Sequence, residues 1–91
     1  MLENLSSNNP YSGLRILIAN DEQTTVKILK TLICNKLGIP ADQVMSAHNG
    51  LEALNIATDR EVDVILMDLS MPVMNGFDSC MKIRSHFSQL Q

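Results

Sequence analysis

Residues 62–68 read VDVILMD, a pattern that indicates the fold class. Its apolar side chains are almost continuous up to the closing Asp68, which is typical of a strand buried on both faces in a parallel sheet. A run of the same kind, LRILIA, precedes it at residues 14–19, and VMSA at residues 44–47 is a brief strand between the two. The sequence therefore predicts three short strands, at residues 14–19, 44–47 and 62–67.

The spacing of apolar residues changes after the first strand, and the new spacing predicts a helix from Glu22 to Leu37. Apolar residues recur there at three- and four-residue spacing, which places them on one face of a helix. They are Val26, Leu29, Ile33 and Leu37, with Leu32 beside them. Gly38 stands where a left-handed cap belongs and Pro40 prevents continuation, so we expect the helix to end there.

Two further helices are predicted, one after each of the other strands. Asn49 can cap a helix that has Glu52 at its third position. The inward face of this helix is expected to consist of Leu51, Leu54 and Ala57. After the third strand, a loop with the sequence MPVMNG at residues 71–76 leads to a last helix around residues 77–84.

The alternation of strand and helix predicts one α/β domain with a parallel sheet and right-handed crossovers. Residues 1–13 are polar and rich in Asn and Ser, and we expect them to be a disordered leader. The domain is expected to span residues 14–87, followed by a polar tail at 88–91. Ninety-one residues with 45% hydrophobic content suffice for one small domain.

The composition excludes several classes of function. The 7 Lys and Arg residues against 10 Asp and Glu give a formal charge of −3, which argues against sequence-independent binding to nucleic acid or to an anionic membrane. The longest apolar runs have five or six residues, too few for a membrane span. The 2 cysteines form neither a disulfide framework nor a metal-ligand spacing, which favours a reducing compartment, so we expect a cytoplasmic location.

Two aspartates follow predicted strands, and in an open parallel sheet the functional site lies beyond the carboxyl ends of the strands. Asp21 follows the first strand and Asp68 the third. Adjacent strands lie roughly 5 Å apart, so the two carboxylates are expected to converge and to repel each other unless a proton or a cation intervenes. A Mg²⁺ ion with oxygen ligands is the simplest way to neutralise this repulsion. An aspartate beside such an ion can attack phosphorus to form an acyl phosphate. The alternative is that each aspartate only forms a turn or caps a helix.

Three segments carry a more specific pattern. They read IANDE at residues 18–22, AHNGLEAL at residues 47–54 and VILMDLSMPVMNGF at residues 64–77. Their order and spacing resemble the receiver domain of two-component response regulators, above all in Asp68, Met71-Pro72 and Gly76. The resemblance covers Leu14 to Arg84 and implies a partial flavodoxin-like receiver fold, truncated after the third β-α unit. Its three parallel strands would lie in the order 2-1-3, with three helices.

The resemblance also implies roles for individual residues. Asp68 would be the phosphoacceptor and would receive a phosphoryl group from the phosphohistidine of a histidine kinase or a histidine phosphotransfer protein. Mg²⁺ would be bound by Asp21, Asp68 and the main-chain carbonyl of Ser70, and weakly, through a water molecule, by Asn20. The family usually has two consecutive acids after the first strand. Asn20 replaces the first of them and removes a negative charge, so we expect weaker Mg²⁺ binding.

The length of the chain is the second departure from the family, which has five β-α units. The missing units would supply a Ser or Thr and a Lys that contact the phosphoryl group. Because a preorganised cation contributes much to phosphoryl transfer, we expect the transfer to be impaired. The third strand would then be an open sheet edge, available for pairing.

These features favour a signalling module and not an enzyme: a receiver-like phosphoacceptor of a phosphorelay. The alternative is a degenerate receiver, or a gene fragment, that binds partner proteins without being phosphorylated. A phosphatase of the haloacid dehalogenase type is set aside. That family places a second Asp two residues after the first, where this chain has Ser70.

Overall fold

The computed structural model describes residues 9–11 and 13–90. The strands are β1 (Ile16–Ala19), β2 (Val44–Ala47) and β3 (Val64–Met67), and the helices are α1 (Gln23–Leu37), the 3₁₀ helix η2 (Ala41–Gln43), α2 (Gly50–Asp59) and α3 (Gly76–Leu90). Strand and helix alternate as predicted. None of the helices in this part of the chain is both long and apolar enough to cross a membrane.

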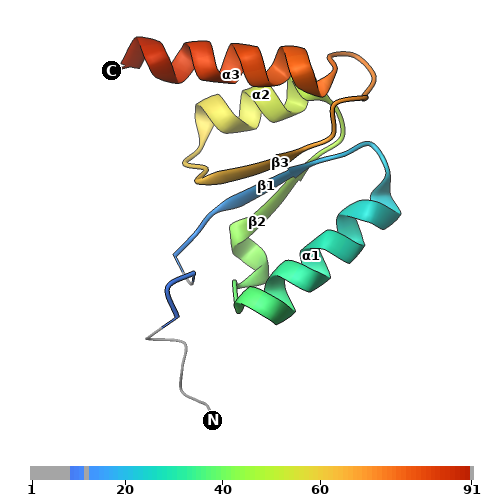
Figure 1. Cartoon of the computed structure of the whole chain (residues 1–91), viewed down its shortest axis with the longest axis vertical. Helices are drawn as coiled ribbons and strands as arrows, with labels where there is room; N and C mark the ends of the chain where they lie inside the picture. The colour runs from blue at the N-terminus through green and yellow to red at the C-terminus, as the bar shows by residue number, and fades with distance from the viewer. Residues whose placement is uncertain (1–8, 12, 91) are drawn as a thin grey trace.

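The three strands form one parallel sheet in the order β2-β1-β3, which confirms the predicted topology of a partial flavodoxin-like fold. Ala19, the last residue of β1, lies beside Ala47 of β2 and Met67 of β3. Figure 1 shows α1 on one face of the sheet and α2 and α3 side by side on the other. The carboxyl ends of all three strands therefore lie at one rim of the sheet.

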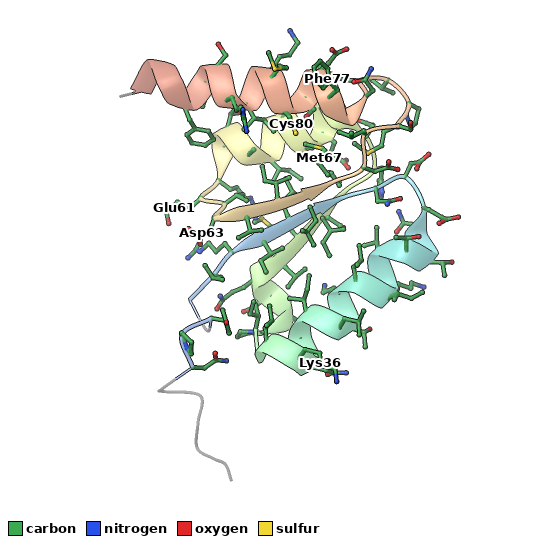
Figure 2. All side chains as sticks on the ribbon, viewed as in Figure 1. Lys36, Glu61, Asp63, Met67, Phe77 and Cys80 are labelled. Atoms are coloured by element: carbon green, nitrogen blue, oxygen red, sulfur yellow. The ribbon has the colours of Figure 1, made fainter. Side chains whose placement is uncertain are left out.

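The core lies on both faces of the central strand β1, whose four residues are all buried. Leu17 and Ala19 pack toward α2 and α3, whereas Ile16 and Ile18 pack toward Val26 of α1. Figure 2 shows Met67 on the same side of the sheet as α2 and α3. Because β1 has a strand on each side and helices on both faces, none of its positions is exposed to solvent. This explains its uninterrupted apolar sequence.

Helix α2 turns a different side to the core from the one we predicted. Leu51 was expected to point inward but is 41% exposed, whereas Ala53 and Ala57 are fully buried and Leu54 is half-buried. The reason is that α3 packs directly against α2, and small residues allow two helices to approach closely. The prediction for Leu51 was therefore wrong. It assumed that the larger apolar residues face the core, whereas the close contact with α3 favours small ones.

Other differences lie at the ends of the predicted segments. β1 and β3 each begin two residues later than expected, and α3 continues to Leu90, beyond residue 87. The side chain of Asn9 donates a 2.7 Å hydrogen bond to the carbonyl of Leu37, and its oxygen accepts from the N–H of Tyr11 at 2.9 Å. This part of the expected leader is therefore ordered against the end of α1, while residues 1–8 and 12 lie outside the described residues.

Candidate functional site

The predicted site residues lie together at the carboxyl rim of the sheet. The N–H of Asp68 donates to the carbonyl of Ala19 at 2.9 Å, and the N–H of Asn20 donates to the carbonyl of Ala47 at 3.0 Å. These two hydrogen bonds continue the strand ladders past their last residues, so Asn20 and Asp68 occupy neighbouring positions. Asp21 follows directly and is exposed, whereas Asp68 is half-buried. Asp21 and Asp68 therefore follow adjacent strands at one rim of the sheet, and the convergence of their carboxylates stays a prediction.

Both turns at this rim are closed by side-chain oxygens. Oδ1 of Asn20 accepts a hydrogen bond from the N–H of Glu22 at 2.9 Å, and Oδ1 of Asp68 accepts one from the N–H of Ser70 at 3.1 Å. Asx turns of this kind are what the alternative interpretation of these residues predicts. Within the described part of the chain, however, Oδ2 of Asp68 and both carboxylate oxygens of Asp21 accept no hydrogen bond. Turn formation therefore occupies one oxygen of Asp68 and leaves the other available to a ligand.

The donor set at the rim suits a hard cation better than a soft one. The donors predicted from the sequence are the carboxylates of Asp21 and Asp68, the amide oxygen of Asn20 and the carbonyl of Ser70, all of them oxygen atoms, and Mg²⁺ prefers oxygen ligands together with several waters. Among the described residues no group of three or more His, Cys, Asp or Glu side chains could hold a metal ion. Asp21 and Asp68 are two carboxylates, so an ion held by them would need water molecules to complete its shell.

The loop between β3 and α3 is held in place by two glycines. The N–H of Gly76 donates to the carbonyl of Leu69 at 3.1 Å, and a Cβ atom added at Gly76 would fall on the carbonyl of Asp68. The N–H of Gly50, the first residue of α2, donates to the carbonyl of Met74 at 2.7 Å, and a Cβ there would overlap that carbonyl. The backbone of the loop thus approaches both glycines too closely for any side chain, and this fixes the main chain around Asp68.

Ser79 is a further positioning residue, one that the sequence analysis missed. Its side chain is fully buried, and its hydroxyl donates to the carbonyl of Gly50 at 2.7 Å. Ser79 lies three residues after Gly76 and four before the buried Ile83. That helical spacing was the available signal, because it places a small polar residue in the inward stripe of α3.

The loop that follows β2 reaches the same rim. Oδ1 of Asn49 accepts from the N–H of Glu52 at 2.8 Å, which confirms the predicted helix cap, and the carboxylate of Glu52 accepts from the N–H of His48 at 2.6 Å. The ring nitrogen Nδ1 of His48 is 2.8 Å from the side-chain nitrogen of Gln23. This contact links the loop after β2 to the start of α1.

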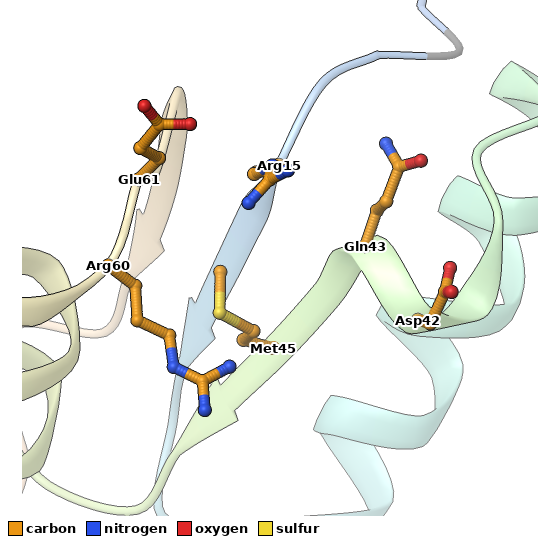
Figure 3. A pocket seen from close by; sticks show the side chains of 6 residues that line it. All are labelled: Arg15, Asp42, Gln43, Met45, Arg60 and Glu61. Atoms are coloured by element: carbon orange, nitrogen blue, oxygen red, sulfur yellow. The ribbon is translucent and has the colours of Figure 1, made fainter.

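A cavity of about 250 Å³ lies at the opposite end of the sheet. It is lined by the residues shown in Figure 3: Arg15, Asp42, Gln43, Met45, Arg60 and Glu61. Arg15 directly precedes β1, Gln43 precedes β2, and Arg60 and Glu61 lie before β3. The cavity is therefore at the amino ends of the strands, away from Asp21 and Asp68.

The sequence of the chain matches one family model and several curated proteins. The family model described as "Response regulator receiver domain" matches residues 16–91. The chain is 38% identical over 69 residues to the autoinducer 1 sensor kinase/phosphatase LuxN of Vibrio harveyi, and 39% identical over 69 residues to the probable transcriptional regulator ycf27 of Cyanidium caldarium. Each match covers 76% of this chain but only 8% and 26% of those proteins, respectively. The chain thus spans a small part of the curated relatives it matches.

Solved structures show the same similarity. The response regulator TrrA of Thermotoga maritima, in complex with Mg²⁺-BeF, superposes with a TM-score of 0.72 at 29% identity, covering 79% of this chain and 59% of that one. The chemotaxis protein CheY4 of Vibrio cholerae superposes with a TM-score of 0.70 at 28% identity, covering 82% of this chain and 61% of that one.

Proposed function

Because this chain belongs to the response regulator receiver domain family, we propose that it is a phosphoacceptor module of a two-component phosphorelay. Asp68 is the phosphoacceptor, and the donor is the phosphohistidine of a histidine kinase or a histidine phosphotransfer protein in the cytoplasm. The observation that carries the proposal is that Asp68 follows β3 beside Asn20, at the rim shared with Asp21, with Oδ2 accepting no hydrogen bond within the described residues.

The proposed step is a transfer of the phosphoryl group from nitrogen to oxygen. Oδ2 of Asp68 forms a bond to phosphorus while the P–N bond of the phosphohistidine breaks, and the imidazole leaves with that electron pair. The N–H of Ser70 holds Oδ1 by a 3.1 Å hydrogen bond, so the carboxylate is oriented before the donor arrives. A carboxylate fixed in this way loses little further freedom when it reacts.

The same residues would hold Mg²⁺. Asp21 and Asp68 supply carboxylate oxygens, Ser70 its main-chain carbonyl, and Asn20 its amide oxygen through a water molecule. The ion would neutralise negative charge on the phosphoryl oxygens during transfer. Support for this ion comes from TrrA, a structural neighbour that was solved in complex with Mg²⁺-BeF, and from the all-oxygen donor set.

One observation favours a second candidate, a receiver that binds partners without being phosphorylated. The rim segments at residues 20–22, 48–49 and 68–75 contain no Lys or Arg. A phosphoryl group on Asp68 would therefore meet no fixed cation from these loops, and such cations contribute strongly to phosphoryl transfer. On this second proposal the chain acts by binding partner proteins, and Asp68 remains unmodified.

Incubation with acetyl phosphate and Mg²⁺ tests the proposal directly. We expect intact-mass analysis to show the addition of one phosphoryl group, in an adduct that is stable in acid and removed by hydroxylamine. Asp68→Asn should prevent the addition, whereas Asp78→Asn, at an exposed aspartate in the first turn of α3, should leave it unchanged. Circular dichroism of each variant checks that it is folded. If the folded wild type forms no adduct, or if the adduct persists in Asp68→Asn, the phosphoacceptor proposal is wrong and the interaction module is favoured.

A further inference from the structure

An Asn-Gly pair stands at the start of each helix that follows β2 and β3. Asn49-Gly50 lies at the start of α2 and Asn75-Gly76 at the start of α3. Asparagine before glycine is especially prone to deamidation, because glycine has no side chain to hinder the attack of its backbone nitrogen on the preceding side-chain amide. The chain therefore carries the same reactive pair in two different environments.

Both asparagines cap their helices in the same way. Oδ1 of Asn75 accepts a hydrogen bond from the N–H of Asp78 at 2.8 Å, and Oδ1 of Asn49 accepts one from the N–H of Glu52 at 2.8 Å. A donor on this oxygen stabilises the negative charge that develops there when a nucleophile adds to the amide carbon. The two caps therefore favour the reaction to a similar extent and do not distinguish the two sites.

The two glycines differ in how firmly they are held. The N–H of Gly50 donates to the carbonyl of Met74 at 2.7 Å, and the carbonyl of Gly50 accepts from the hydroxyl of the buried Ser79 at 2.7 Å. The N–H of Gly76 donates to the carbonyl of Leu69 over a longer distance, 3.1 Å. The backbone nitrogen that must attack is therefore less strongly held at Gly76 than at Gly50.

The segment that leads to Asn75 is also more exposed and more strained. Asn75 is exposed to solvent, whereas Asn49 is half-buried. Val73, two residues before Asn75, has a φ of 69° and is 78% exposed. Strain of this kind lowers the free energy needed to open a segment locally. We therefore expect the loop before α3 to open more often than the start of α2.

We infer that Asn75 is a site of spontaneous deamidation in the folded protein, and that Asn49 is protected by its contacts. When the loop opens, the backbone nitrogen of Gly76 loses its proton and attacks the side-chain carbon Cγ of Asn75. The new C–N bond closes a succinimide ring, and the side-chain nitrogen leaves as ammonia. Water then opens the ring at either carbonyl and gives aspartate or isoaspartate at position 75. The reaction needs no reactant other than water.

The isoaspartate product would disturb the main chain near Asp68. In isoaspartate the side-chain methylene becomes part of the backbone, so the chain between residues 75 and 76 is longer. Gly76 lies so close to the carbonyl of Asp68 that an added Cβ would overlap it, and the extra length would displace Gly76 from this position. We expect the isoaspartate form to unfold at a lower temperature than the aspartate form, whose carboxylate can still cap α3.

Ageing of the purified chain at mildly alkaline pH, followed by peptide mapping, tests the inference. Cleavage after Lys and Arg places Asn49 in the peptide 37–60 and Asn75 in the peptide 61–82. Mass spectrometry measures the conversion of Asn in each peptide. We expect Asn75 to react about tenfold faster than Asn49 in the folded protein, and the two rates to converge in urea, where the contacts are lost. A folded protein in which Asn49 reacts as fast as Asn75, or in which Asn75 does not react, overturns the proposal.

Two substitutions test the structural cause of the difference. Val73→Gly relieves the left-handed strain and should slow the reaction at Asn75, whereas Val73→Ala retains Cβ and should slow it less. Ser79→Ala removes the hydroxyl that is bonded to Gly50 and should speed the reaction at Asn49.

The quantity compared is the ratio of the two rates within one chain, because global unfolding exposes both pairs alike. This ratio should fall in Val73→Gly and in Ser79→Ala. A ratio that stays at the wild-type value in both variants would show that these contacts do not protect Asn49 relative to Asn75. The inference does not depend on the proposed function, since the reaction involves no phosphoryl group.

Discussion

The hydroxyl of Ser79 donates a 2.7 Å hydrogen bond to the carbonyl of Gly50, and the N–H of Gly50 donates a 2.7 Å hydrogen bond to the carbonyl of Met74. The first residue of α2 is thereby bonded both to α3 and to the loop that follows Asp68. Gly50 therefore couples the loop after Asp68 to the packing of α2 against α3.

Replacing Ser79 by Ala should lower the free energy of unfolding by about 1 kcal/mol. The substitution removes a hydrogen bond in a fully buried position, and such bonds contribute about that much net stability. Ser85→Ala, at an exposed position of the same helix, is the control and should change stability little. Urea denaturation followed by circular dichroism measures both. Equal effects of the two substitutions would show that the bond from Ser79 to Gly50 does not stabilise the fold.

Substituting Ala for Gly50 or Gly76 should destabilise the protein by about 3 kcal/mol, at the upper end of the usual cost of overpacking. At both positions the added Cβ would overlap a backbone carbonyl that cannot move as a side chain would. Gly13→Ala provides the matched control, since nothing lies within 4 Å of a Cβ added there. Thermal unfolding of the three variants compares them, and tolerance of Ala at either buried glycine would contradict the close approach of the loop.

Val73→Gly should stabilise the protein by about 1 kcal/mol. Val73 has a φ of 69° and is 78% exposed. The left-handed region costs a residue with a side chain roughly 1–2 kcal/mol, a cost that glycine avoids. Little packing is lost with so exposed a side chain. Val73→Ala, which retains Cβ, should recover much less of this energy, so chemical denaturation of both variants separates backbone strain from β-branching.

Asn20→Asp should strengthen Mg²⁺ binding roughly tenfold, a change of about 1.4 kcal/mol. The substitution adds a negative charge at a position whose neighbour in register is Asp68, and ligand charge raises the affinity for divalent cations. An Asp oxygen can still accept the hydrogen bond from the N–H of Glu22, so the turn is retained. Isothermal titration with Mg²⁺ measures the change. Asn55→Asp, exposed on α2, is the control, and an equal gain there would indicate only a general charge effect.

Much of the fold followed from local sequence. Short, nearly continuous apolar runs located the strands, because a strand of a parallel sheet is buried on both faces. The three- to four-residue spacing of apolar residues located α1, because a helix turns one face to the core. Gly38 indeed adopts a φ of 67° at the end of α1, and Asn49 caps α2. The parallel order of the strands predicts that Asp21 and Asp68 lie at one rim of the sheet.

Other features depended on how the elements pack. Periodicity identifies which residues share a face of a helix and predicted the burial of Ala57, but in α2 both sides carry apolar residues, and only the contact with α3 selects Ala53 over Leu51 as an inward residue. The same contact buries Ser79, which local sequence alone would leave in solvent as readily as Ser85.

The type and order of the elements, and the rim at which the acidic residues lie, therefore follow from local sequence, since they depend on local geometry and on chain direction. Contacts between elements determine which side of α2 is buried, that the loop after Asp68 is bonded to Gly50, and how far Val64 and Leu66 are exposed in the described part of the chain. These features depend on contacts between segments that are distant in sequence, so the sequence of one segment alone does not predict them.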